Sequence, residues 1–153
     1  MATMNIDFFM KEALIEAKKA YKLDEVPIGG VIVDNFTKKI VARGHNRSNK
    51  NKIAIDHCEI LLIIKACKKL EKKYLDDFTL FITLEPCTMC AAAISKAHIG
   101  KLYFGTYDEK NGGIEKFRIA YDRDNIFLPE IYGGILEKDC KDILKNYFKS
   151  KRI

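Results

Sequence analysis

The chain has 153 residues and a composition, 48% apolar and 31% charged, that is typical of a globular protein and excludes a disordered one. A chain of this length holds one hydrophobic core, so we expect a single domain over residues 1–153. No apolar run approaches the ~20 residues that a bilayer-spanning helix needs. Residues 1–7 also lack the basic and apolar regions of a secretory signal. These features argue against a membrane partner and predict a cytoplasmic protein.

Five cysteines and an excess of basic residues narrow the chemistry. An odd number of cysteines in a chain without an export signal argues against a disulfide framework and favours metal ligation or buried thiols. The net charge of +6 favours a polyanionic partner such as nucleic acid, because bound Lys and Arg side chains release condensed counterions. Codon bias also produces lysine-rich sequences, so the charge alone does not identify a partner.

The first half of the chain predicts a helix followed by a hairpin. Apolar side chains recur at helical spacing over residues 6–21. Two strands are expected at Ile28–Val33 and Ile40–Ala42, joined by a turn over residues 34–39. The polar stretch over residues 44–56 predicts a loop, which is where functional sites are often built.

The second half alternates helices with strands. The predicted helices span residues 59–70, 87–97 and 137–151, and the predicted strands span residues 78–84 and 101–105. Residues 107–130 show no dominant pattern. The order helix, hairpin, helix, strand, helix, strand predicts a three-layer α/β/α domain around a central mixed sheet.

Two short motifs supply the ligand types that zinc prefers. An H-x-E motif lies at residues 57–59 and a P-C-x-x-C motif at residues 86–90. Imidazole and thiolate groups are zinc ligands, and the spacing of Cys87 and Cys90 suits one shared metal. His57 and Cys87 both stand at predicted helix N-termini, where the helix dipole favours thiolates. Three protein ligands leave the fourth tetrahedral position for a water molecule, whose pKa zinc lowers to roughly 7.

Glu59 stands two residues after the histidine ligand and completes this pattern. A carboxylate beside an activated water accepts its proton and passes it to a ring nitrogen and to the departing amine. H-x-E followed by P-C-x-x-C is the pattern of zinc deaminases that act on cytosine or adenine. These residues therefore predict a zinc-dependent hydrolytic deaminase with Glu59 as the group that moves protons.

Other interpretations of the same residues are open at the level of sequence. Asp56 and Glu59 also fit a helix capping box, in which Asp56 caps the helix and Glu59 bonds back to it. An isolated C-x-x-C pair is typical of redox sites, but such a site needs no H-x-E motif. A structural zinc site would need a fourth protein ligand. The candidates for that ligand are His45, Cys58, Cys67, His98 and Cys140.

Position argues against four of these five candidates. Cys58 directly follows His57 and would have difficulty reaching the same metal. Cys67 and Cys140 lie on apolar helical stripes, as core residues do, and His98 ends a predicted helix.

Several segments along nearly the whole chain resemble one protein family. At these segments the chain resembles the cytidine-deaminase superfamily and, within it, the bacterial tRNA-specific adenosine deaminases. Leu84–Cys90 narrows the resemblance, although bacterial guanine deaminases share much of that stretch. The segments are Glu25–Gly30, Gly44–Arg47, Thr83–Cys90, Ile99–Gly100, Phe104–Gly105, Asp108–Gly112 and Gly134–Leu136.

The resemblance implies a cytidine-deaminase-like fold and hydrolysis of adenosine to inosine at the wobble position of a tRNA anticodon loop. It implies one Zn²⁺ per chain. His57, Cys87 and Cys90 would hold that ion, and Glu59 would be the proton shuttle. It further implies a homodimer whose interface helps to shape the RNA site.

The resemblance also assigns substrate contacts. Asn46 would hydrogen-bond the flipped base or its sugar, Ile28 would line the base pocket, and Asp108 would contact the anticodon backbone or ribose. Without the resemblance, Asn46 is a turn residue, Asp108 a loop cap and Ile28 a strand core residue. Phe148 is expected either to stack on a loop base or to pack against the sheet. The basic residues that either contact phosphates or form a solvated helix face are Lys138, Lys141, Lys145, Lys149, Lys151 and Arg152.

Two departures from the family pattern bear on the site. Cys58 stands where the family usually has Ala, and its backbone N–H is still expected to bind the base. The segment Ile114–Asn125 lacks the expected run of small residues and carries Lys116, Arg118 and Arg123 instead.

The second departure bears on RNA recognition and not on the deamination chemistry. Two alternative functions are open at the level of sequence. One is a deaminase of a free base or nucleoside, such as guanine or cytosine. The other is a non-enzymatic zinc module that binds RNA, in which Glu59 would be dispensable and the metal would have four protein ligands.

Overall fold

The centre of the structure is a mixed five-stranded sheet, seen in a computed structural model that describes residues 3–120 and 126–152. The strand order is β2-β1-β3-β4-β5. β1 pairs antiparallel with β2 and β3, whereas β4 pairs parallel with β3 and β5, so the predicted mixed sheet is confirmed. The strands span Gly29–Asp34 (β1), Ile40–His45 (β2), Phe78–Leu84 (β3), Lys101–Thr106 (β4) and Glu130–Tyr132 (β5).

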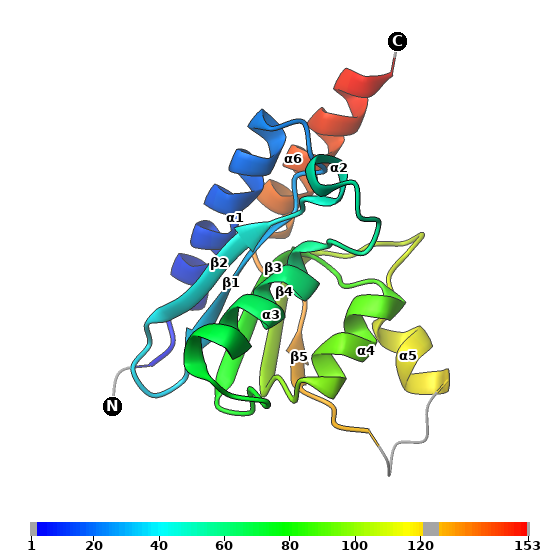
Figure 1. Cartoon of the computed structure of the whole chain (residues 1–153). Coiled ribbons are helices and arrows are strands. Elements are labelled where there is room, and N and C mark those ends of the chain that lie inside the picture. The colour runs from blue at the N-terminus through cyan, green and yellow to red at the C-terminus, as the bar shows by residue number, and fades with distance from the viewer. Residues whose placement is uncertain (1–2, 121–125, 153) are drawn as a thin grey trace.

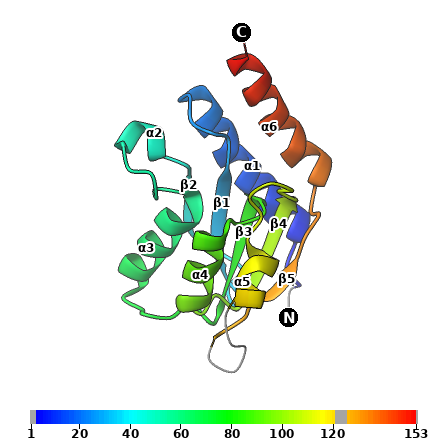
Figure 2. The ribbon, with the colours of Figure 1, turned by 90° about the vertical axis from the view of Figure 1, so that its right-hand side faces the viewer.

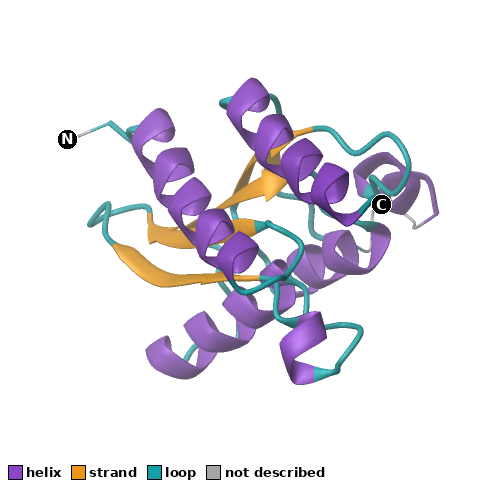
Figure 3. Ribbon diagram, turned by 90° about the horizontal axis from the view of Figure 1, so that it is seen from above, coloured by secondary structure: helices purple, strands orange, loops and turns teal. Residues whose placement is uncertain are grey.

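Helices cover both faces of the sheet and complete the three predicted layers (Figure 1). α1 and α6 lie on one face, and α3, α4 and α5 lie on the other (Figure 2). The view from above shows the sheet between these two layers (Figure 3). Within the described ranges, none of the helices is long and apolar enough to cross a bilayer. The helices span Ile6–Lys22 (α1), Ser48–Asn51 (α2), Cys58–Leu70 (α3), Thr88–Lys96 (α4), Ile114–Ala120 (α5) and Glu137–Lys151 (α6).

Each face of the sheet has its own apolar core. Successive side chains of a strand point to opposite faces, and β3 shows this most clearly. Leu80 and Ile82 pack in the core that includes α3 and α4, whereas Phe81 packs against Phe9 of α1. Because both faces of β3 are covered, its sequence is apolar throughout rather than alternating.

The elements differ from the predicted ones in three places. β2 continues to His45, beyond its predicted end, because its last two residues pair with Gly30 and Gly29. The predicted loop over residues 44–56 contains the short helix α2. Residues 107–130, where the sequence shows no dominant pattern, contain α5, and the three-residue strand β5 begins at their last residue.

The topology brings the predicted site residues to one edge of the sheet. β1 is antiparallel to both β2 and β3, so β2, β3 and β4 run in the same direction and end at the same edge. Asn46 follows β2, Cys87 follows β3 and Asp108 follows β4, while Ile28 directly precedes β1. The carboxyl ends of parallel strands are where α/β proteins build their ligand sites.

Candidate metal centre and active site

The three predicted zinc ligands lie together at the start of two helices. His57 is the N-cap residue of α3 and Cys87 is the N-cap residue of α4, with Cys90 in the first turn of α4. The Nδ1 atom of His57 lies 3.6 Å from the Sγ atom of Cys87 and 3.5 Å from that of Cys90. All three ligand atoms lie within 4.8 Å of one another, so these residues form a metal-binding triad.

The distances and donor types fit a tetrahedral zinc ion. Zn–S bonds of about 2.3 Å and Zn–N bonds of about 2.0 Å place tetrahedral sulfur and nitrogen ligands about 3.5 Å apart. The observed separations of 3.5 and 3.6 Å match this geometry. One imidazole and two thiolates are also the mixed soft donor set that zinc prefers.

Among the described residues, no fourth His, Cys, Asp or Glu joins the triad. The thiol of Cys58 donates to the carbonyl of Gly44 at 3.3 Å, and Cys140, a residue of α6, lies in the core on the other face of the sheet. The ring of His98 stacks with Tyr74, 4.2 Å between ring centroids. A structural zinc site with four protein ligands therefore finds no support in this geometry.

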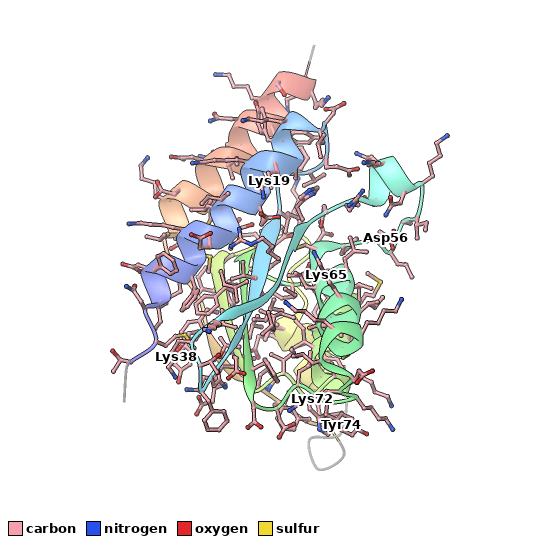
Figure 4. All side chains as sticks on the ribbon, turned by 60° about the vertical axis from the view of Figure 1, so that its left-hand side comes forward. Lys19, Lys38, Asp56, Lys65, Lys72 and Tyr74 are labelled. Carbon is pink, nitrogen blue, oxygen red and sulfur yellow. The ribbon has the colours of Figure 1, made fainter. Side chains whose placement is uncertain are left out.

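The predicted capping box at the start of α3 is wrong. The N-cap residue is His57, one position later than the pattern suggests, and its side chain makes no capping hydrogen bond. Asp56 lies in the preceding loop (Figure 4), where it accepts a hydrogen bond from the side chain of Asn51 at 2.8 Å. Glu59 is buried, at 4% exposure, rather than folded back on a cap.

Glu59 lies beside the triad in surroundings that favour its neutral form. Burial raises the pKa of Glu59 to about 7, while the ring of His57 and the thiol of Cys90 oppose that shift. A hydrogen bond from Cys90 lowers the pKa of Cys87 to about 5, so Cys87 is the cysteine that more readily becomes a thiolate. A carboxyl group with a pKa near neutrality can both accept and donate protons.

Asn46 and Ile28 lie next to the start of α3. Asn46 is buried, and its Oδ1 atom accepts a hydrogen bond from the backbone N–H of Cys58 at 2.7 Å. Its own N–H donates to the carbonyl of Ile28 at 3.1 Å. The N–H of Cys58 is therefore already bonded within the protein, which corrects the expectation that it binds the base. Asn46 is consequently a structural link between β1, β2 and α3 rather than an ordinary turn residue.

Asp108 uses its carboxylate to shape the loop after β4. Its Oδ1 atom accepts from the N–H groups of Lys110 and Asn111, at 3.2 and 3.0 Å. The backbone N–H of Asp108 donates to Glu85 at 3.0 Å. Glu85 is a residue of the site that the sequence interpretation missed, although it stands directly before the P-C-x-x-C motif.

The loop after β4 also packs tightly on the cysteine motif. Gly113 donates its N–H to the carbonyl of Pro86 at 2.9 Å, and Gly112 forms a bridge with Cys87. A Cβ atom at Gly113 would overlap the backbone nitrogen of Thr88. Only glycine permits this approach, so the Asp108 loop and the cysteine motif form one packed unit.

The basic residues predicted either to contact phosphates or to form a solvated face lie on the exposed side of α6, with Arg152 at its C-cap. Lys138 pairs with Asp142 at 2.7 Å, and Lys151 pairs with Asp24. Phe148 is exposed and makes an edge-to-face contact with Tyr147, so it does not pack against the sheet. Lys116 on α5 is exposed, whereas the side chain of Arg118 and all of Arg123 lie outside the described residues.

A His-Cys-Cys triad beside a buried glutamate, at the carboxyl edge of an α/β/α sheet, defines the class of zinc-type deaminases. The chain belongs to the MafB19-like deaminase family, whose profile matches residues 4–152, and within it to the tRNA-specific adenosine deaminases. The tRNA-specific adenosine deaminase of Rickettsia felis is 39% identical over 145 residues, which cover 94% of this chain and 100% of the relative. That of Bacillus subtilis is 40% identical over 95% of this chain and 90% of the relative.

Solved structures agree with this assignment. A structure from a study of A-to-I editing by tRNA deaminases at the wobble position superposes with a TM-score of 0.83 and 40% identity. The superposition covers 90% of this chain and 99% of that one. The guanine deaminase of Bacillus subtilis is more distant, with a TM-score of 0.65 and 28% identity over 82% of this chain and 83% of its own.

Proposed function

We propose that this protein hydrolyses adenosine to inosine and ammonia at the wobble position of a tRNA anticodon. One observation carries the proposal: the triad of His57, Cys87 and Cys90 lies beside buried Glu59 in a chain 39% to 40% identical to tRNA-specific adenosine deaminases over nearly its whole length. Hydrolysis replaces the exocyclic amine with an oxygen from water, so the reaction needs an activated water and a group that moves protons.

One zinc ion per chain fits the triad. When bound, it would act as a Lewis acid that activates water for attack on the carbon bearing the amine. The N-terminus of α4 supports this role for the chain, since its dipole stabilises the anionic form of Cys87, the cysteine whose pKa is lowered.

Glu59 handles the protons. Its carboxylate accepts a proton from the attacking water and passes it to the ring nitrogen. It then takes the second proton from the hydroxyl newly bonded to carbon and passes it to the amine, so that the carbonyl of inosine forms as the C–N bond breaks and ammonia leaves. A pKa near 7 suits both directions of transfer at neutral pH. Burial beside the triad also keeps this carboxyl away from bulk solvent.

The residues that would contact the substrate lie at the edge of the sheet where the metal site is. Because the Oδ1 atom of Asn46 is held by Cys58, its amide NH₂ group is the part left to donate to the base or ribose. Ile28 would form the apolar wall of the base pocket, and the Asp108 loop would contact the anticodon backbone or ribose. An unpaired loop base leaves its stack at little energetic cost, and exposed lysines of α6 would neutralise phosphates.

We further propose that two copies of the chain associate. The side of α3 away from the sheet exposes Ile64, at 46%, and leaves Ile60 half-buried. Burying such a face against a second copy would remove apolar surface from water. Light scattering of the purified protein is expected to give about twice the chain mass of 17.6 kDa, and a monomer mass at micromolar concentration would contradict the dimer.

The decisive experiment measures inosine in a synthetic anticodon stem-loop with a wobble adenosine, with free guanine, cytosine, cytidine and adenosine run alongside. The wild-type protein is expected to convert the stem-loop alone. Glu59→Ala should keep one zinc per chain and lose at least about a thousandfold in turnover, because it removes only proton transfer. Glu71→Ala is the matched control, since Glu71 ends the same helix and is exposed.

Free guanine is the substrate of the second candidate function, which the shared stretch Leu84–Cys90 favours. The 28% identity to the guanine deaminase of Bacillus subtilis is weaker support than the 40% identity to a tRNA deaminase structure. Ammonia released from guanine but not from the stem-loop would support the zinc-dependent mechanism and contradict the assignment of tRNA as the substrate. Turnover retained in Glu59→Ala would contradict the mechanism itself.

A further inference from the structure

Glu25 is a buried carboxylate to which neither the metal site nor the proposed chemistry assigns a role. It is 1% exposed and lies in the turn between α1 and β1. Its Oε1 atom accepts a hydrogen bond from the backbone N–H of Asn49 at 3.1 Å, and its Oε2 atom accepts one from Lys50 at 2.6 Å. Both carboxylate oxygens therefore bind the first turn of α2.

α2 depends on this distant carboxylate because its own cap is missing. Arg47 is the N-cap residue of α2, and its side chain makes no capping hydrogen bond. A helix of four residues, Ser48–Asn51, does not hold its shape in isolation, since nucleation costs more than so few bonds return. Glu25 satisfies the two N–H groups that a local Ser, Thr, Asp or Asn would ordinarily satisfy.

The segment that Glu25 anchors carries Asn46 and leads to the metal site. Asn46 directly precedes Arg47, and the N–H of Arg47 donates to the carbonyl of Asp56 at 3.1 Å, next to His57. The N–H of Asn46 is bound by the carbonyl of Ile28, three residues after Glu25. Asn46 is therefore held from two sides. Ile28, just before β1, binds its backbone directly, and Glu25 holds the helix α2 that follows it.

We propose that Glu25 is a positioning residue, which holds α2 so that Asn46 keeps its hydrogen bond to the N–H of Cys58 and presents its amide to the substrate. This inference rests on the proposed function, because it assumes that Asn46 contacts the base or ribose. Glu25 itself does not touch the reacting atoms. Its effect is on geometry, and errors of about 1 Å in such geometry lower turnover strongly.

The test compares Glu25→Gln with Glu16→Gln. The amide of Glu25→Gln keeps the size of the side chain but replaces one of the two acceptor oxygens with a donor. Glu16 is the matched control because it is 4% exposed and bonds the side chains of Lys19 and Arg43 instead of α2. Zinc content, kcat and KM on the stem-loop, and ¹H–¹⁵N amide spectra would be measured for each protein.

Glu25→Gln is expected to bind one zinc per chain and to lose about tenfold to a hundredfold in kcat, with KM changed by less than about threefold. KM changes little because phosphate contacts elsewhere supply most of the RNA affinity. The amide signals of Asn49 and Lys50 should move upfield as their carboxylate partner is lost, and the Cys58 signal should move with them. Glu25→Asp, which keeps two acceptor oxygens, should recover part of kcat. Glu16→Gln should leave kcat and all three signals unchanged.

Either of two kinetic results would overturn the proposal. One is Glu25→Gln with wild-type kcat, and the other is an equal loss in Glu16→Gln, which would indicate a general effect of removing a buried carboxylate. If Glu25→Gln does not fold, Glu25→Asp takes its place, with a smaller loss expected. A wild-type protein that is inactive on the stem-loop would contradict the proposed function. The positioning role would then be decided by the amide signal of Cys58 alone. If that signal does not move in Glu25→Gln, the positioning role is overturned as well.

Discussion

The N-terminus of α1 and the N-termini of α3 and α4 are built in different ways. α1 follows Asn5, whose Oδ1 atom accepts a hydrogen bond from the N–H of Phe8 at 3.1 Å. α3 and α4 begin at His57 and Cys87, and neither of these side chains caps its own helix. A side-chain cap is worth about 1 kcal/mol, so the two helices that carry the metal ligands give up that local stabilisation.

Other segments of the chain hold these two uncapped ends. The first N–H of α3 is bound by Asn46, which follows β2. The turn before α4 is held by the backbone N–H of Gly113 on the carbonyl of Pro86. The comparison teaches that a metal-binding side chain at the N-cap position does not cap its own helix. The start of that helix is then stabilised by contacts with other segments of the chain.

Removing a ligand should produce the largest effect and tests the metal side of the comparison. His57→Ala is expected to lose the bound zinc and at least about a thousandfold in turnover, because two thiolates alone do not complete the site. Metal analysis and inosine formation measure both losses. His98→Ala is the control, since the ring of His98 stacks with Tyr74 away from the triad, and it should keep one zinc per chain.

Removing zinc with a chelator and measuring the melting temperature gives a second test of His57→Ala. The melting temperature of the wild-type protein should fall when zinc is removed, because a ligand that binds only the folded state stabilises it. The melting temperature of His57→Ala should not respond. An equal response in both proteins would place the zinc at some other site.

Gly113→Ala should have the next largest effect and tests the tertiary support of α4. The added Cβ atom would overlap the backbone of Thr88, so we expect a loss of about 3 kcal/mol in the free energy of unfolding. Gly44→Ala is the matched control, because its Cβ would meet only the side chain of Leu62 at 3.6 Å, an ordinary contact. Urea unfolding curves compare the two, and similar losses would contradict the role assigned to the loop packing.

Asn5→Ala should have the smallest effect and tests the locally capped helix. Loss of the cap should lower the free energy of unfolding by about 1 kcal/mol and leave turnover and zinc content unchanged. The same urea and inosine measurements apply. A loss of turnover in this variant would show that the α1 end is coupled to the site, against the contrast drawn above.

Sequence predicted the parts of the site that depend on short spacing. Cys87 and Cys90 are one helical turn apart, and Glu59 stands two residues after His57, so their chemistry is readable without the fold. The central mixed sheet followed from the order of the predicted helices and strands. The capping box failed because Asp-x-x-Glu is a local pattern, whereas burial of Glu59 beside the triad decided where its side chain lies.

Contacts between distant segments could not be predicted in this way. The bonds of Asn46 to Cys58 and of Glu85 to Asp108 join residues whose proximity depends on the order of strands in the sheet. α2 and β5 were missed because four and three residues carry too little periodicity to be recognised. The roles of Asn46, Ile28 and Asp108 toward substrate stay predictions until RNA binding is measured.

Cys140 lies at the contact between α6 and the sheet, and its reactivity can therefore be used to follow that contact. The Sγ atom of Cys140 is fully buried against Gly105 of β4, so close that a Cβ there would overlap it. Burial also raises the pKa of this thiol to about 12, which keeps it in its unreactive protonated form. An alkylating reagent can therefore reach this thiol only when the packing around it opens. The rate of alkylation at Cys140 would thus measure how often the contact between α6 and β4 opens.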